Sequence, residues 1–166
     1  NYEFRYLKNM LARNESAIRL TTVLQEADAD YASIDKTAKR VFPVQRDELF
    51  QYDVILFGDV NPSLLSTSVV NNIVDFVKVK GGGVLFISGP RYTPLAYRNL
   101  PLAGLLPVDL NFAVAPPPED NLNEAYLMRP TELGLAAPQM QLGSDPAESL
   151  QIWRNLPPCY WLLEYH

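Results

Sequence analysis

Ser88, Gly89 and Pro90 form a tight turn directly after an apolar run, which is where α/β hydrolases carry a nucleophilic serine. In such an elbow a histidine removes the proton from the serine. Phe86 and Pro90 stand where the motif has glycine, and Pro90 has no N–H to offer an oxyanion. The only histidine of the chain is His166. Ser88 is therefore a candidate nucleophile without an evident base, and a turn-forming serine is the competing interpretation.

Further candidates stand at the ends of the two central apolar runs. Gly58 and Asp59 end the first run, so we expect Asp59 near Ser88, at the carboxyl edge where open α/β sheets bind ligands. Asp59 could bind a metal ion or a ligand hydroxyl, or it could cap the turn at Asn61-Pro62-Ser63. Arg91 follows the second run and could bind an anion. The candidate ligand-binding residues are Glu3, Arg5, Gly58, Asp59, Ser88, Gly89 and Arg91, and no set of metal ligands is predicted.

Two of these candidates lie far from the others in sequence. Glu3 and Arg5 fall in an expected amphipathic helix over residues 3–13. They would lie at the carboxyl edge of the sheet if a strand before this helix ended at that edge and led into the helix. They could equally form a solvated surface pair.

Bulk composition narrows the classes of partner and cofactor. The chain has 166 residues, 48% of them hydrophobic, and a net charge of −5. Lys and Arg form no stripe, which argues against nucleic acid or an anionic membrane as the main partner. No apolar run approaches the roughly 20 residues that span a bilayer, so no direct membrane insertion is expected. Cys159 is the only cysteine, which excludes a disulfide framework and a cysteine-based zinc site. No cofactor is predicted.

The elements that would hold the candidate residues form a strand–helix–strand unit. Asp53–Phe57 and Val84–Ile87 are nearly continuous apolar runs, typical of parallel strands that are buried on both faces. Between them, apolar side chains recur at helical spacing from Val69 to Val77, with Ser63 or Ser66 as the N-cap. A helical crossover between two strands predicts parallel pairing with a right-handed connection.

Together with the rest of the chain, this unit predicts an α/β fold with a mostly parallel sheet. Residues 1–166 are expected to form a single domain. Gly81-Gly82-Gly83 follows a helix and precedes a strand, so it should end that helix rather than cradle a phosphate. A first strand is expected to precede Asn1, in a longer parent protein. The other predicted elements are strands over 18–24, 108–115, 126–128 and 160–163, a helical turn over 46–50, an irregular stretch over 131–142, and a helix opening at Ser144-Asp145-Pro146.

The order of these motifs resembles the class I glutamine amidotransferase-like superfamily. The resemblance rests on YDVILFGDV (52–60), an amphipathic helix, and GGGVLFISGP (81–90). It is closer to the amidotransferase-like domain of large bacterial membrane-anchored proteins, which often carry a von Willebrand A-type domain. Similar segments occur there in the same order, here YEFRYLKNML (2–11), LPLAGLLPVDL (100–110), RPTELG (129–134) and IWRNLPP (152–158).

This resemblance implies a three-layer (αβα) flavodoxin-like fold whose first strand is missing from the N-terminus. In true amidotransferases the elbow carries a cysteine, which a downstream histidine and glutamate activate. Here Ser88 stands at that position and no downstream His-x-Glu follows. We therefore expect a non-catalytic module that binds a ligand, a protein partner or other domains of the same chain. The resemblance also implies a place in the cell envelope, outside the cytoplasmic membrane. The alternatives are a hydrolase that uses Ser88 or a metal near Asp59, and a structural spacer.

Overall fold

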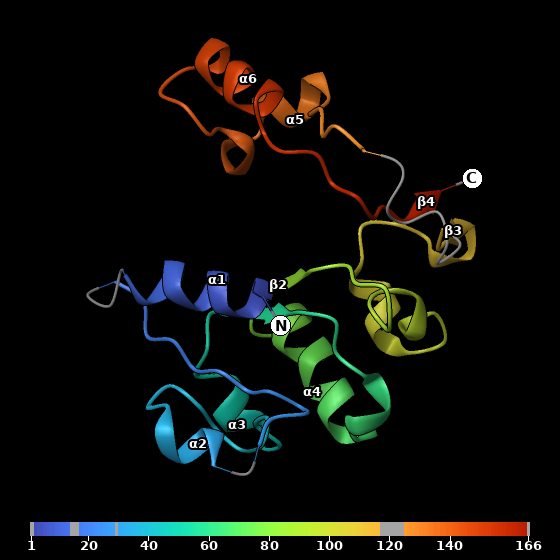
Figure 1. Ribbon diagram of the computed structural model, residues 1–166. Coiled ribbons are helices and arrows are strands. Elements are labelled where there is room, and N and C mark those ends of the chain that lie inside the picture. The colour runs from blue at the N-terminus through green and yellow to red at the C-terminus, as the bar shows by residue number, and fades with distance from the viewer. Residues whose placement is uncertain (1, 14–16, 29, 117–124, 166) are drawn as a thin grey trace. The chain divides into compact units, whose positions relative to one another are not determined.

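The computed structural model describes residues 2–13, 17–28, 30–116 and 125–165. The chain divides into two compact units, Asn1–Asn111 and Phe112–His166, and Figure 1 shows their elements. The protein is mixed α/β, with several short helices and a small parallel sheet in the first unit. That the two units act as a single domain stays a prediction.

A strand–helix–strand unit forms the centre of the first unit, as the sequence predicts. β1 (Val54–Phe57) pairs in parallel with β2 (Gly83–Phe86), with Val54 opposite Gly83 and Phe57 opposite Phe86. The helix α4 (Thr67–Lys78) connects the two strands. Because both strands run the same way, their carboxyl ends lie at one edge, where the chain continues into Gly58 and into Ile87.

The start of α4 and its buried face follow from its sequence. The Ser66 hydroxyl accepts a hydrogen bond from the Val69 N–H (3.3 Å), which satisfies one of the free donors of the first turn. The apolar side chains of α4 that are buried recur at helical spacing, which fixes the side that faces the core. They are Val69, Val70, Ile73 and Phe76.

Glycines end α4, as predicted. Gly81 has a φ of 79°, a left-handed conformation that side chains disfavour. The N–H groups of Gly81 and Gly82 donate to the carbonyls of Val77 (3.2 Å) and Phe76 (2.9 Å). These bonds satisfy carbonyls of the last turn and lead the chain into β2.

The prediction that both central strands are buried on both faces is wrong. Ile55 and Phe57 are 8% and 3% exposed, whereas Val54 and Leu56 are 57% and 40% exposed. Leu85 of β2 is 53% exposed. Successive side chains of a strand point to opposite faces, so one face of this sheet packs on the core and the other is open in this unit.

The first unit also confirms two of the predicted helices and corrects one strand. Residues 18–24 form no strand among the described residues, because only Thr22 pairs there, in an isolated parallel bridge with Ala38. The helix over 3–13 and the helical turn over 46–50 are confirmed. The remaining elements are α1 (Tyr2–Ala12), α2 (Tyr31–Ile34), α3 (Arg46–Leu49) and the 3₁₀ turns η1 (Pro62–Leu64), η2 (Leu95–Tyr97) and η3 (Pro101–Leu105), with η4 (Leu110–Phe112) at the junction of the units.

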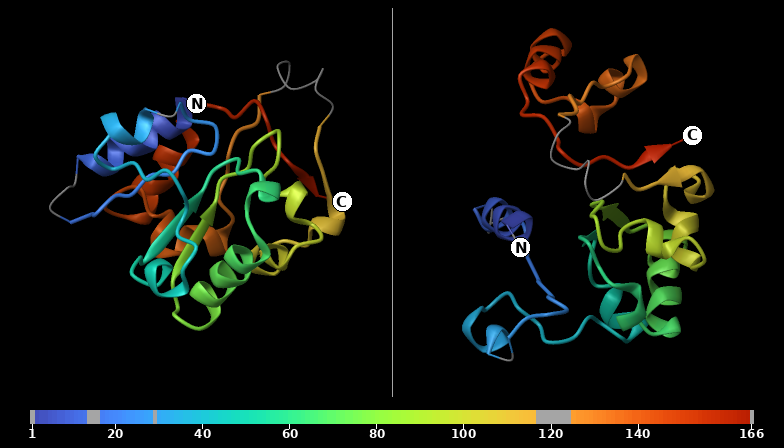
Figure 2. Two further views of the ribbon diagram at one scale, coloured as in Figure 1. Left: turned by 90° about the horizontal axis from the view of Figure 1, so that it is seen from below. Right: turned by 45° about the vertical axis from the view of Figure 1, so that its right-hand side comes forward.

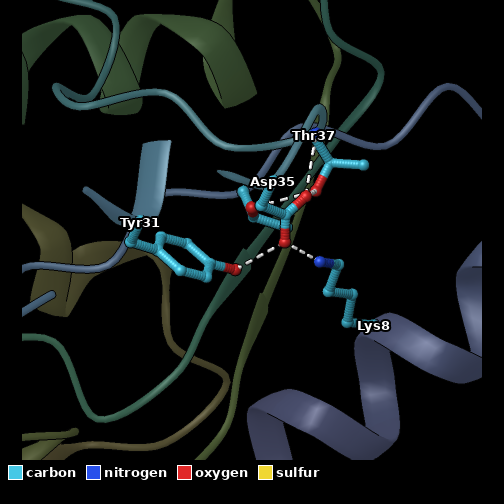
Figure 3. A network of polar contacts seen from close by, with 5 residues as sticks. Lys8, Tyr31, Asp35 and Thr37 are labelled. Atoms are coloured by element: carbon cyan, nitrogen blue, oxygen red, sulfur yellow. Dashed lines mark hydrogen bonds and ion pairs between the residues drawn. The ribbon is translucent and has the colours of Figure 1, made fainter. Parts of the chain in front are cut away.

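A polar network centred on Asp35 ties α1 to the segment that follows residue 30 (Figure 3). One carboxylate oxygen of Asp35 accepts from the Lys8 ammonium and from the Tyr31 hydroxyl, the latter at 2.9 Å. The other oxygen accepts from the Thr37 N–H (2.9 Å) and hydroxyl (2.8 Å). All of these donors converge on one carboxylate, so Asp35 has a structural role.

The second unit contains short elements. β3 (Ala113–Val114) pairs antiparallel with β4 (Glu164–Tyr165), the red arrow beside the C-terminus in Figure 2. α5 (Glu132–Ala136) lies next to α6 (Pro146–Arg154), and η5 spans Pro138–Met140. Asp145 caps α6 by accepting from the N–H groups of Ala147 and Glu148, which confirms the predicted helix start.

Several predictions for this unit need correction. The stretch 131–142 is not irregular, because Thr131 caps α5 by accepting from the Gly134 N–H. The predicted strand over 160–163 is wrong, and pairing falls on Glu164–Tyr165 instead. Strand pairing within 108–115 is restricted to Ala113–Val114, and within 126–128 only Tyr126 pairs, in a bridge with Cys159. In the described parts of the chain, no helix is long and apolar enough to cross a bilayer.

Candidate functional site

Asp59 organises the loop that follows β2. It follows Gly58, the first residue after β1, at the carboxyl edge of the parallel pair. Its Oδ1 accepts from the N–H groups of Tyr92 (2.7 Å) and Thr93 (2.9 Å), and its Oδ2 accepts from the N–H of Arg91 (3.0 Å). The two carboxylate oxygens therefore hold three successive backbone donors in one direction, much as a cap holds the first turn of a helix.

Gly89 lies close to this carboxylate. A Cβ at position 89 would lie 2.4 Å from Cγ of Asp59, far inside van der Waals contact. The Gly89 N–H also donates to the Thr93 carbonyl (2.8 Å), which closes the loop. A glycine is needed here for space beside Asp59, and the requirement does not depend on a nucleophile at Ser88.

Two buried hydroxyls extend the network beneath the loop. The Thr93 hydroxyl donates to the Gly58 carbonyl (2.9 Å), and the Tyr97 hydroxyl donates to the Val60 carbonyl (2.8 Å). The two hydroxyl oxygens lie 3.0 Å apart, and Thr93 and Tyr97 are 1% and 0% exposed. Each hydroxyl has one hydrogen, and these two hydrogens are shared among the three contacts. Neither hydroxyl therefore has a spare donor for a ligand.

The ring of Tyr97 packs beneath the ends of both strands. It meets the rings of Phe57 (6.5 Å between centroids) and Phe86 (6.0 Å) edge-on. Burial raises the pKa of Tyr97 to about 12, so its hydroxyl keeps its proton at neutral pH and remains a donor. The network is a neutral, fully bonded support for the loop.

Replacing Thr93 with valine is expected to lower the free energy of unfolding by about 1 kcal/mol, because it removes a buried hydroxyl and its hydrogen bond to the Gly58 carbonyl, which keeps the Val60 N–H as a donor. Tyr97→Phe should have an effect of similar size. The double variant should cost less than the sum, since the two hydroxyls share a contact. Urea denaturation of the four proteins measures this, and strictly additive effects would contradict the network.

The turn after β1 has its own cap, so one interpretation of Asp59 was misplaced. The sequence predicts a cap on the turn at Asn61-Pro62-Ser63 as the alternative to a metal ion or a ligand hydroxyl at Asp59, and the cap is the interpretation that is wrong. Instead, Oδ1 of Asn61 accepts from the Ser63 N–H (3.0 Å). Asp59 caps the later loop at residues 91–93, which is remote in sequence.

Ser88 is exposed and lies in the loop just beyond β2. In the described part of the chain its hydroxyl has no hydrogen bond to another residue. No non-glycine residue there has a positive φ, so the backbone at Ser88 lacks the strained turn of a nucleophile elbow. His166 lies outside the described residues.

The guanidinium of Arg91 is exposed at the surface and lies next to the side chain of Glu26. Its Nη1 lies 3.5 Å from Oε2 of Glu26, and the two side chains are 66% and 68% exposed. Close by in sequence, Gln25 and Asn61 bond reciprocally: the Gln25 amide donates to the Asn61 carbonyl (3.0 Å) and accepts from the Asn61 N–H (2.8 Å). The loops after residue 24, after β1 and after β2 are thus linked.

The structure brings together most of the predicted site residues. Gly58, Asp59, Gly89 and Arg91 are joined by the contacts above, and Ser88 precedes Gly89. Glu3 and Arg5 are exposed on α1, and within the described ranges no hydrogen bond or ion pair joins them to these loops. Their membership of the site stays a prediction.

The described residues contain no group of three or more His, Cys, Asp or Glu side chains that could hold a metal ion. Both oxygens of Asp59 already accept backbone hydrogen bonds. A metal at Asp59 would have to compete with these donors.

Sequence reasoning missed several residues of this edge. Thr93 and Tyr97 are four apart, a spacing that lets two side chains meet on a helical turn. This signal was present, but nothing in the sequence linked it to Gly58 and Val60. Glu26 and Gln25 carry no local signal, because their partners at this edge, Arg91 and Asn61, are more than thirty residues away.

Comparison with known proteins finds no family model, no curated protein and no solved structure that matches this chain.

Proposed function

We propose that this chain is a non-catalytic, degenerate glutamine amidotransferase-like module that binds a ligand or protein partner at the carboxyl edge of its parallel strands. The proposal includes a three-layer flavodoxin-like fold and a place within a larger bacterial envelope protein. The parallel β1–β2 pair and its helical crossover support the fold part of the proposal, because both are typical of such folds.

The non-catalytic part of the proposal is supported by the hydrogen bonding of Asp59 and Ser88, the two residues best placed for catalysis. The carboxylate of Asp59 is used in holding three backbone N–H groups. Ser88 is exposed in unstrained backbone, without a hydrogen-bonded base among the described residues. A nucleophilic serine needs an adjacent base, and Asp59 does not serve as one because its carboxylate is used in holding the loop.

The binding part rests on position and exposure. In open α/β sheets, ligands bind beyond the carboxyl ends of the strands. There the loop after β2 is held by Asp59, and it presents Ser88 and Arg91 to the surface. A rigid loop with exposed polar side chains suits recognition, because little order is lost when a partner binds.

A serine-directed fluorophosphonate probe tests the catalytic alternative. We expect labelling of the wild type no stronger than that of Ser88→Ala, since no base activates the hydroxyl. Ser63→Ala removes another exposed serine hydroxyl of the same unit and is the matched control. Labelling that Ser88→Ala abolishes and Ser63→Ala retains would establish a hydrolase instead.

The binding part is tested by backbone NMR with a fragment library. Shift changes should concentrate at the amides of Gly58, Ser88, Gly89 and Arg91. Fragments that bind elsewhere, or none at all, would favour a structural spacer. The sequence flanking this chain in its genome tests the envelope assignment, which needs a membrane anchor in the same gene product.

A further inference from the structure

The segment Thr21–Gln25 contacts the residues that flank β1 on either side. Near its start, the Tyr52 hydroxyl donates to the hydroxyl of Thr21 (3.4 Å). At its end, Gln25 exchanges two hydrogen bonds with Asn61, at 2.8 and 3.0 Å. Residues 21 and 25 thus meet residues 52 and 61 in the same order, as two parallel chains do.

The same segment pairs with a third stretch of chain. Thr22 forms a parallel bridge to Ala38, in which the Thr22 N–H donates to the Thr37 carbonyl and the Lys39 N–H to the Thr22 carbonyl, both at 2.8 Å. The chain between them contains α2. This is a second crossover between parallel segments, short and with one bridge only.

The two crossovers start from neighbouring segments and lead to different partners. One leads from 21–25 to 37–39, and the other leads from β1 to β2. Among the described residues no strand pairing joins 21–25 to β1, so the order 37–39, 21–25, β1, β2 rests on the side-chain contacts of Thr21 and Gln25, and it places a reversal of connection between 21–25 and β1. Ligands of open α/β sheets bind outside the carboxyl ends of the strands at such a switch point.

Arg91 and Glu26 stand at this position. Glu26 follows the 21–25 segment, and Arg91 is fixed through its backbone N–H by Asp59, 3.0 Å away. The 3.5 Å ion pair between their side chains is about two-thirds exposed, and exposed pairs are weak because water screens both charges. The carboxylate of Glu26 therefore marks where an anionic group sits against Arg91, and it can be displaced at low cost.

We propose that the switch point between residues 21–25 and β1 binds a small molecule through a carboxylate or phosphate group, with Arg91 as the anion-binding residue and Glu26 as its internal competitor. This assignment rests on the proposed binding function and names the chemistry of its ligand. The guanidinium of Arg91 suits either anion, because its N–H groups match the oxygens of both in pairs.

NMR titrations with acetate and with inorganic phosphate, at constant ionic strength, test the assignment. The wild type should show saturable shifts at the amides of Gln25, Asn61 and Arg91 with at least one anion. Glu26→Gln should tighten that binding about threefold, because it removes the carboxylate that competes for Arg91 through a weak, exposed ion pair. Arg91→Gln should abolish saturation. The anion that saturates identifies the group.

The control is Arg46→Gln, which breaks another exposed ion pair of the same unit, with Asp75 at 3.3 Å. It should leave the titration unchanged, and circular dichroism should show all variants folded. Loss of binding in Arg46→Gln, unchanged affinity in Glu26→Gln, or no saturation by either anion would overturn the assignment. If neutral fragments still shift the edge amides, only the anion assignment fails. If nothing shifts them, the proposed function fails as well.

Discussion

Replacing Asp59 with alanine is expected to lower the free energy of unfolding by about 2–4 kcal/mol. The change removes a charged acceptor from the N–H groups of Arg91, Tyr92 and Thr93 together. Hydrogen bonds to charged groups contribute more than neutral ones, and water can only partly replace them here because Thr93 is 1% exposed. Urea denaturation followed by circular dichroism measures the loss.

Three further variants separate the cap from the charge. Asp53→Ala removes an aspartate whose side chain is fully exposed, with a 3.5 Å ion pair to Lys80, and it should change stability by less than about 0.5 kcal/mol. Asp59→Asn keeps one oxygen acceptor and should fall between the wild type and the alanine variant. Gly89→Ala displaces the carboxylate sterically, so its effect should add little to that of Asp59→Ala. Full additivity of these two would contradict the cap.

Gly82→Ala is expected to destabilise the protein by about 1–3 kcal/mol, because it forces a methyl group into a filled core. A Cβ at position 82 would lie 2.2 Å from Cζ of Phe76, a side chain with 0% exposure. Phe76 also packs edge-on against Phe50 (6.3 Å between centroids), so its ring cannot easily move aside. Thermal and urea unfolding measure the loss.

Gly104→Ala is the matched control, since a Cβ there would meet nothing within 4 Å. It should be neutral or slightly stabilising, because alanine restricts the unfolded chain more than glycine does. In a Phe76→Leu background, which leaves room next to position 82, Gly82→Ala should cost about 1 kcal/mol less than in the wild type. An equal cost in both backgrounds would mean that the ring is not what opposes the methyl group.

Local signals in the sequence were reliable at three helix ends that depend on short-range contacts. Ser66 caps α4, Asp145 caps α6 and Gly81 ends α4, each through contacts with residues within four or five positions. The parallel pairing of β1 with β2 was also predictable, because a helical crossover of this length leaves no other simple connection.

The exposure of the central strands was not predictable in the same way. An apolar run shows that a strand tolerates burial on both faces, but what covers each face is decided by other parts of the chain. Val54 and Leu85 illustrate this, because both are apolar and both are more than half exposed. Residues 18–24 have strong strand propensity, yet only Thr22 finds a backbone partner.

The roles of the edge residues depend on contacts across more than thirty residues. The sequence placed Asp59, Ser88 and Arg91 together, because they follow neighbouring parallel strands. It did not show that the Asp59 carboxylate turns to the backbone of residues 91–93, or that Glu26 meets Arg91. The sequence by itself therefore determined the strand–helix–strand unit, its caps and the edge that gathers polar residues. Only the tertiary structure decided which of those residues are used in holding the loop and which remain exposed, since hydrogen bonds between distant segments exist only once the chain has folded.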